Sequence, residues 1–363
     1  MTRSSLRIGA SGVILLALTV VAAIATGIDV EAFGLPFAAL LALVLVGVVF
    51  ALANLRGLRV SIDVPNDVRV GEPMAFDLRV EVGYPLLAPQ DVLVRVAFDR
   101  GAARPIAFVQ RADRGGVIPI RAEHRFGLRG MRDTARVTFT SSAPFGWFTI
   151  ERSFDLSVRL LVLPAVDRLR NADDLSRAAS RLVRHGRRTR ASEDLATVRP
   201  WRTGESERIV HWKLSAKRGI RVAREFESHA REAMHIVLST AVGGVRVKTH
   251  WGFERCVRLA SSLVEHFHAQ GHPVRLTLLR DAPTLFVASR HRHGTRAIQR
   301  ELAVVTPRFV EHAELVLPAD ATCVVRAGGT ASVATGVVDL DVTEFATVAR
   351  WIGFAGGSWK PAS

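Results

Sequence analysis

The stretch from residue 191 to residue 226 reads ASEDLATVRPWRTGESERIVHWKLSAKRGIRVAREF, and the rest of the chain is organised around it. It sets arginines and lysines among two tryptophans, Trp201 and Trp212, and several aliphatic residues. A solvated charge run would not need the tryptophans, and a simple core strand would not need so many guanidinium groups. We interpret the stretch either as a junction in which buried ion pairs fix one packing arrangement or as a surface for an anionic partner.

The residues around Gly204 indicate how such a junction is built. Gly204 followed by Glu205 suits a turn in which glycine adopts a positive φ. Arg199 and Arg208 lie on either side of this turn and can present planar guanidinium groups to carboxylates such as Glu193 and Glu205. The arrangement favours an internal clamp of ion pairs and tryptophans between two domains, with a docking face as the alternative.

Two further interpretations of the same stretch stay open. If residues 210–214 form a strand, Trp212 faces the same side as Val210 and Leu214. A hydrolase would use carboxylates near a histidine for acid–base chemistry, and the candidates for that role are Glu193, Asp194, Glu205 and His211.

The order of residues in this stretch resembles the signature of the domain of unknown function 58 family. The matching positions are Glu193, Arg199, Trp201, Gly204, Glu205, Arg208, Ile209, His211, Trp212, Lys213, Ser215, Ala216 and Lys217. Three positions depart from the family pattern, because Trp201 stands where tyrosine is usual and Glu205 and His211 stand where aspartate is usual or common.

The resemblance implies an architecture and a partner. Family members carry two N-terminal membrane spans, a β-rich region with a Pro-Phe-Gly turn, and a C-terminal domain similar to von Willebrand factor type A. The resemblance also implies a bacterial protein that works with a MoxR-type AAA+ ATPase in the assembly of membrane or envelope complexes. These properties are expectations for this chain, and we expect no cofactor.

The first 56 residues predict a two-span transmembrane hairpin. Two uncharged apolar runs, 8–28 and 32–55, are each about long enough to cross the hydrocarbon region of a bilayer. The linker between them is acidic, whereas Arg3 and Arg7 precede the first run and Arg56 and Arg59 follow the second. The positive-inside rule therefore predicts a plasma-membrane protein with the 27–36 turn outside and both termini and the soluble domains in the cytoplasm.

Residues 57–165 predict an antiparallel β-sandwich, because apolar and polar residues alternate in segments such as MAFDLRVEV and DVLVRVAF. In the segment SSAPFGWF, we expect Phe145, Trp147 and Phe148 to plug the sandwich, with an aromatic docking site as the alternative. Residues 166–232 are expected to form a linker and the signature. Residues 233–363 alternate strand and helix patterns and predict an α/β domain with a mostly parallel sheet.

In von Willebrand factor type A domains, the first strand ends in an Asp-x-Ser-x-Ser motif that binds a divalent cation. The resemblance places Ser239 at the aspartate position and Ala241 at the first serine position. Magnesium prefers hard oxygen donors that include carboxylates, so we predict that this metal site is lost. Asp339 and Asp341 can supply carboxylates near a later strand end, but such residues more often cap or turn.

Charge and cysteine content limit the remaining classes. The net charge of +15 comes from basic residues spread along the chain without a dense tail, which makes nucleic acid an unlikely partner and suits an anionic membrane surface. The two cysteines lack zinc-ligand spacing and indicate a reducing compartment. The function predicted from the sequence is a non-catalytic scaffold or adaptor anchored in the membrane, with the hydrolase and a nucleic-acid-binding protein as alternatives.

Overall fold

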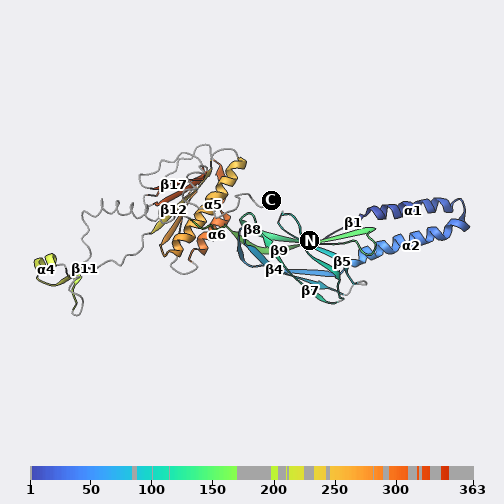
Figure 1. Cartoon of the computed structure of the whole chain (residues 1–363), viewed down its shortest axis with the longest axis horizontal. Helices are drawn as coiled ribbons and strands as arrows, with labels where there is room; N and C mark the ends of the chain where they lie inside the picture. Colours follow the sequence, from blue (N-terminus) through green and yellow to red (C-terminus); the bar gives the residue numbers. More distant parts are fainter. Residues whose placement is uncertain are drawn as a thin grey trace. The chain divides into compact units, whose positions relative to one another are not determined.

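The computed structural model describes residues 2–83, 88–99, 101–113, 115–169, 198–202, 210, 212–224, 233–242, 246–280, 282–288, 294–309, 317–318, 321–327 and 337–342. The chain divides into two units, Met1–Leu163 and Pro164–Ser363 (Figure 1). The helix expected near residues 343–351 lies outside the described residues.

The first unit contains a hairpin of two apolar helices, α1 (Ala10–Thr26) and α2 (Val30–Asn54). Its loop is shorter than the predicted 27–36 turn, because α2 already begins at Val30 and Pro36 lies inside the helix. The side chain of Asp29 caps α2 by accepting a hydrogen bond from the backbone nitrogen of Ala32 at 3.1 Å. At a rise of 1.5 Å per residue, α2 is about 38 Å long and α1 about 26 Å.

The hairpin exposes apolar side chains along most of its length. By length and composition α2 is able to cross a membrane, and α1 is a shorter apolar helix. The exposed apolar residues of the two helices include Val13, Ile14, Leu18, Val20, Val21, Ile24, Leu41, Leu43, Leu45, Val46, Val49 and Leu52. This surface is compatible with a membrane anchor.

Two β-sheets form the rest of the first unit. One sheet has the order β1 (Thr2–Ile8), β9 (Phe148–Leu163), β8 (Gly130–Ser141), β5 (Gln90–Phe98) and β6 (Arg104–Arg111), and β3 (Asp67–Arg69) also pairs with β9. The other has the order β2 (Leu58–Asp63), β4 (Pro73–Val82) and β7 (Val117–Arg125). All of these pairings are antiparallel except that of β3 with β9.

The two sheets share one apolar core. Along β4, buried and exposed residues alternate without a break, which is the period-two pattern of a half-buried strand. Phe76 and Leu78 of β4 join Val94, Val137 and Leu160 of the other sheet in the same cluster of buried side chains. The first unit is therefore a two-layer β structure, as the alternation over residues 57–165 predicts.

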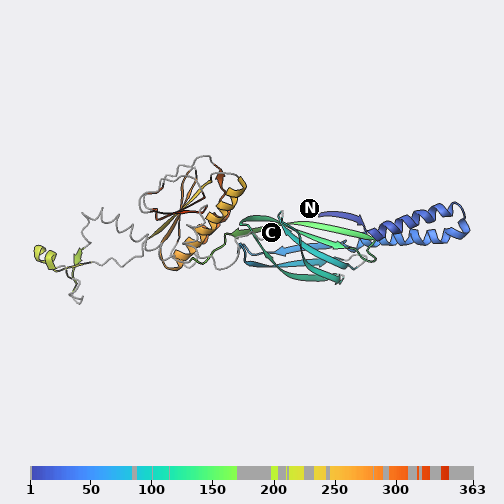
Figure 2. The ribbon, with the colours of Figure 1, turned by 45° about the horizontal axis from the view of Figure 1, so that its top comes forward.

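Both ends of the hairpin are attached to this β structure. The predicted hairpin domain begins at residue 1, but residues Thr2–Ile8 form β1, which pairs with β9 in the register Ile8 opposite Phe148. Strand β1 leads into α1, and α2 leads through Leu55 into β2. The loop between the helices consequently lies at the end of the hairpin remote from the sheets (Figure 2).

The second unit contains a mostly parallel sheet. Its strands are β12 (Met234–Val242), β13 (Val274–Leu279), β14 (Thr284–Val287), β15 (Arg308–Phe309), β16 (Cys323–Ala327) and β17 (Val338–Asp341), in the order β14-β13-β12-β16-β17 with β15 beside the end of β12. Only the pairing of β14 with β13 is antiparallel among the described strands of this sheet. A mostly parallel sheet of this kind is typical of α/β folds.

Two helices cover one face of this sheet. Phe253 and Leu263 of α5 (Arg246–Ala269) and Ile298 of α6 (Arg296–Val304) pack into one core with Ile236 and Leu276 of the sheet. A second, smaller cluster that includes Val237 and Val324 lies on the alternate positions of β12 and β16.

The start of the predicted 166–232 linker is fastened to α5. The guanidinium group of Arg258 donates two hydrogen bonds of 2.6 Å to the carboxylate of Asp167. The backbone nitrogen of Asp167 donates to the hydroxyl of Ser262 at 2.9 Å. Further along, the signature contributes β10 (Val198–Pro200), α4 (Trp212–Arg218) and β11 (Val222–Arg224), and β10 pairs with β11 in antiparallel fashion.

Candidate functional site

The carboxyl end of a parallel sheet is the place where open α/β folds bind ligands. Strand β12 is central in the sheet, and it pairs with β13 on one side and with β16 on the other. In open α/β sheets the crevice lies outside the carboxyl ends of the strands at such a switch point. The positions predicted from the metal motif, Ser239 and Ala241, lie near the carboxyl end of β12.

Strand β12 is irregular at these two positions. Leu238 is paired with Val325 and Val242 with Ala327, so four residues of β12 advance opposite two residues of β16. The hydroxyl of Ser239 is buried and donates to the carbonyl oxygen of Ala241 on its own strand at 3.3 Å. Within the bulge, the Ser239 hydroxyl therefore forms a hydrogen bond with the backbone of its own strand.

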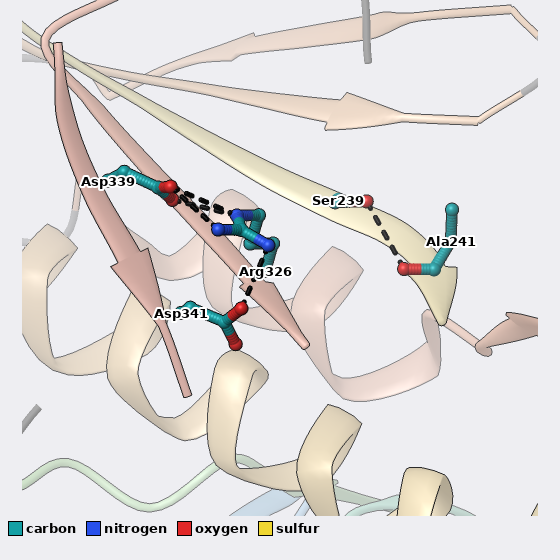
Figure 3. A network of polar contacts seen from close by, with 5 residues as sticks. All are labelled: Ser239, Ala241, Arg326, Asp339 and Asp341. Atoms are coloured by element: carbon teal, nitrogen blue, oxygen red, sulfur yellow. Dashed lines mark hydrogen bonds and ion pairs between the residues drawn. The ribbon is translucent and has the colours of Figure 1, made fainter. Parts of the chain in front are cut away.

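The guanidinium group of Arg326 in β16 lies between two carboxylates of the adjacent strand β17 (Figure 3). The Nε atom of Arg326 donates to Asp339 at 2.9 and 3.1 Å, and the Nη2 atom donates to the same carboxylate at 2.8 Å. The Nη1 atom lies 2.8 Å from a carboxylate oxygen of Asp341. The side chains of Arg326, Asp339 and Asp341 are only 12%, 28% and 11% exposed.

Strand alternation explains why these three residues meet. Val325 of β16 and Leu340 of β17 face the α5 core, so Arg326 and the two aspartates occupy the alternate positions. The register sets Arg326 directly opposite Asp341 and Val324 opposite Asp339. The guanidinium fork can therefore bind one carboxylate in bidentate fashion and still reach the second.

The role of the two aspartates in this structure follows from their ion pairs. The sequence suggests that they are metal ligands or turn residues, whereas they are partners of Arg326. Their oxygens accept guanidinium hydrogen bonds where a divalent cation would need free lone pairs. Among the described residues, no group of three or more histidine, cysteine, aspartate or glutamate side chains lies close enough together to hold a metal ion.

In the signature, Trp201 is held by Arg221. The backbone nitrogen of Trp201 donates to the carbonyl oxygen of Arg221 at 2.9 Å. The guanidinium carbon of Arg221 lies 5.2 Å from the centre of the Trp201 ring, a cation–π distance. This pair joins the end of β10 to the start of β11, so Trp201 stabilises the signature itself.

The second tryptophan behaves differently from the expectation. Residues 212–218 form α4 and not a strand, and the side chain of Trp212 is 58% exposed whereas that of Val210 is buried. Lys213 and Lys217 are also exposed. The hydroxyl of Ser215 is the buried member of this helix, and it accepts a hydrogen bond from the backbone nitrogen of Val222 at 2.9 Å.

The remaining signature positions fall outside what the structure describes. Glu193, Gly204, Glu205, Arg208 and His211 lie outside the described residues. The backbone of Arg199 lies in β10 opposite Ala223, and its side chain is not among those described. The predicted ion pairs of the clamp, and the acid–base group of the hydrolase alternative, therefore remain predictions.

The Arg326 cluster was not found from the sequence. The available signal was an arginine inside the apolar strand CVVRA, together with aspartates two residues apart in VDLD. A charged residue in a buried strand usually has a partner, and the spacing of two places both aspartates on one face.

The comparisons with known proteins add little to this geometry. No family model and no curated protein match the chain. The CARDB domain of a Pyrococcus furiosus protein is 16% identical, with 29% of this chain and 95% of that domain covered and a TM-score of 0.20. A β-glucosidase from Listeria innocua is 14% identical, with 29% of this chain and 16% of the enzyme covered and a TM-score of 0.19. Similarities at these scores support no conclusion about fold or activity.

Proposed function

We propose that this chain is a membrane-anchored, non-catalytic scaffold of the domain of unknown function 58 type. The observation that carries the proposal is the apolar hairpin, whose exposed surface needs a non-aqueous environment and whose two ends join the same β structure. A hairpin attached in this way connects the membrane to the first unit without a flexible linker. That property suits a protein that positions partners at a membrane.

The second unit supports a von Willebrand factor type A-like module. Counted from β12, the strand order runs third, second, first, fifth and sixth, with an antiparallel third strand and the fourth strand, β15, beside the end of β12. We propose that, in this module, a guanidinium group takes the place of the metal ion. Arg326 supplies the positive charge that holds Asp339 and Asp341 near the end of the sheet.

The exposed face of α4 supports a role in partner binding. Trp212 is an exposed aromatic residue, and Lys213, Lys217 and Arg218 on the same short helix are exposed and basic. Interfaces are rich in tryptophan anchors surrounded by polar groups. We propose that this face binds an acidic surface of a MoxR-type AAA+ ATPase and thereby links the ATPase to a membrane or envelope complex.

Charge at the two ends of the hairpin supports the orientation. Arg3 and Arg7 in β1 and Arg56 and Arg59 after α2 flank the end that joins the sheets, whereas Asp29 and Glu31 lie at the remote loop. The positive-inside rule then assigns the soluble units to the cytoplasm.

Membrane anchoring is tested on the full chain in native membranes. The protein should remain in the pellet after alkaline carbonate extraction and enter the soluble fraction only with detergent. A cysteine introduced at Ile28 in the remote loop should react with an impermeant maleimide in intact cells. Release by carbonate would contradict the anchor, and labelling only after cell lysis would contradict the orientation.

Partner binding is tested by photocrosslinking at position 212. A photoreactive amino acid replacing Trp212 should capture an AAA+ ATPase in native membranes. The same group replacing Phe108, an exposed apolar residue of β6, should not. Trp212→Ala with Lys213→Ala should reduce recovery of the ATPase without changing the amount of anchored protein. Equal recovery from positions 212 and 108 would reject the proposed face.

A further inference from the structure

The turn between β8 and β9 is an unexpected feature of the first unit. It covers residues 142–147, with Gly146 at a φ of 73°. The sequence predicts that three aromatic residues plug the core, yet only Phe148 is fully buried. The side chain of Phe145 is 57% exposed, and its ring lies 4.4 Å from the ring of Trp147. An exposed phenylalanine stacked on a half-buried tryptophan at the tip of a β-hairpin calls for an explanation.

This aromatic turn lies against the two apolar helices. The backbone nitrogen of Gly9 donates to the carbonyl oxygen of Trp147 at 2.9 Å. A Cβ atom at Gly12 would overlap the same carbonyl oxygen, and a Cβ atom at Gly47 would meet the Phe148 ring at 3.0 Å and the Trp147 ring at 3.4 Å. The turn is therefore level with the first residues of α1 and with Gly47 of α2.

The length of the hairpin fixes where a bilayer would meet this turn. At 1.5 Å per residue, the stretch of α2 from Val30 to Gly47 rises only about 26 Å, and the stretch of α1 from Gly12 to Thr26 about 21 Å. The hydrocarbon core of a bilayer is about 30 Å thick. If the loop at residues 27–29 lies at the far boundary, the near boundary passes beyond Gly47 and Gly12, towards the sheets. The aromatic turn then lies just inside that boundary.

Exposed side chains on either side of the turn agree with this depth. Val49 and Leu52 of α2, and Leu6 and Ile8 of β1, are exposed although they lie beyond Gly47 and Gly12 in the direction of the sheets. Apolar exposure thus continues past the level of the turn. Arg7 and Arg56 lie at this same end of the hairpin, at a depth where basic side chains contact anionic lipid headgroups.

We propose that Phe145 and Trp147 insert into the headgroup–acyl boundary of the membrane and act as a third attachment point beside the two helices. The proposal rests on the membrane anchoring proposed above and names the lipid interface as the occupant of this surface. Aromatic rings are favoured at that depth because they combine an apolar body with tolerance of a polar boundary. Three attachment points restrict tilting of the first unit, so its sheets keep a fixed orientation to the membrane.

Site-directed spin labelling on the full chain tests the proposal. Cys256 and Cys323 are buried, so a single introduced cysteine can be labelled selectively. The three variants are Phe145→Cys at the turn, Leu18→Cys in the middle of α1, and Met131→Cys at the end of β8 remote from the turn, all at exposed positions. Each is placed in phosphatidylcholine–phosphatidylglycerol nanodiscs that hold one copy, and collision with oxygen and with a water-soluble nickel chelate is measured.

The expected result is graded by depth. The label at 18 should collide mainly with oxygen, the label at 131 mainly with the nickel chelate, and the label at 145 should be several-fold less accessible to the chelate than the label at 131. A label at 145 that is as accessible as that at 131, while 18 remains in lipid, would overturn this inference and leave the anchor intact. A label at 18 in water would refute the anchor itself. Shielding of 145 only in discs with two copies would assign the surface to a second copy and reject the lipid interface.

Discussion

The side chain of Asn54 and the backbone of Gln90 form a reciprocal pair of hydrogen bonds. The Nδ2 atom of Asn54 donates to the carbonyl oxygen of Gln90 at 2.9 Å, and the backbone nitrogen of Gln90 donates to the Oδ1 atom at 2.8 Å. The same Nδ2 atom donates to the hydroxyl of Ser141 at 2.7 Å. Arg152 donates to the carbonyl oxygen of Leu55 at 2.8 Å. Strands β5, β8 and β9 thereby bind the end of α2, where helical carbonyl groups lack partners.

We expect Asn54→Ala to weaken the attachment of the hairpin. Asn54 is completely buried, and its removal takes the side-chain acceptor away from the partly buried backbone nitrogen of Gln90, a cost of about 2 kcal/mol. Thermal unfolding in detergent, followed by circular dichroism, should show a lower midpoint. Ser142→Ala is the control, because its bond of 2.9 Å to Thr149 is exposed and its loss should cost less than about 0.5 kcal/mol. Equal midpoints for the two variants would show that the Asn54 network is not important.

A methyl group at Gly12 should disturb the contact between α1 and the aromatic turn. Its Cβ atom would overlap the backbone carbonyl of Trp147, so the helix or the turn must shift, at a cost of about 1–3 kcal/mol. Gly34→Ala is the matched change in α2, because its Cβ atom would meet its nearest neighbour at an ordinary 3.8 Å. Gly34→Ala should preserve or raise the unfolding midpoint, since alanine favours helix by about 1 kcal/mol over glycine. A Gly12→Ala midpoint as high as that of Gly34→Ala would contradict the close approach.

We expect Arg326→Met to destabilise the second unit by about 3 kcal/mol, because it leaves two largely buried carboxylates without their guanidinium partner. Adding Asp339→Asn and Asp341→Asn to this variant should recover part of the loss, since no unpaired charge remains. The measurement is the free energy of unfolding from denaturant titration. Arg136→Met is the control, because its ion pair with Asp155 is more exposed and should contribute less than about 1 kcal/mol. Similar losses from both arginines, or no recovery in the triple variant, would refute a special role for the cluster.

The β structure of the first unit was predictable because a strand that is buried on one face has apolar residues at every second position. Strands β4 and β5 follow that pattern closely. Strand β1 was missed because its sequence, TRSSLRI, is mostly polar and its pairing partner β9 begins 140 residues further along. Pairing between such distant segments leaves no local signal.

The same reasoning explains why the sequence left a strand open as one interpretation of residues 210–214, where the structure has α4. The segment WKLSAKR contains too few residues for its apolar period to distinguish helix from strand. The side chain of Trp212 is also exposed, whereas tryptophan side chains are usually expected to be buried in a core. The Arg326 cluster depends on which strands become neighbours, and this order is set by the whole sheet and not by the sequence near any one residue.

Neither cysteine should react with maleimide in the native protein at about pH 8, because the thiolate is the reactive form. Burial, and then the charge of Asp341, raise the pKa of Cys256 far above its usual range. Burial, with a smaller effect of Asp339, raises the pKa of Cys323 to about 12. Mass spectrometry should find no label before unfolding and two labels after it. The variant Phe145→Cys should gain one label in the native state, and a labelled Cys256 or Cys323 there would contradict the burial of these thiols.

Acidification should destabilise the first unit through His124. Its ring lies 4.9 Å from that of Phe98 and 4.6 Å from that of Phe126. Burial, followed by the charges of Arg104 and Arg132, lowers the pKa of His124 below its usual 6.5. The unfolded chain therefore binds this proton at a higher pH than the folded chain does, so the stabilisation is present above about pH 6.5 and is lost as the pH falls through that value towards the folded pKa. Between about pH 7.5 and 5.5, wild type should lose more unfolding free energy than His124→Phe, which keeps the aromatic packing but cannot ionise. Arg104→Gln should give an intermediate loss because it removes one of the two repelling charges. An equal loss in wild type and His124→Phe would assign the pH dependence to other groups.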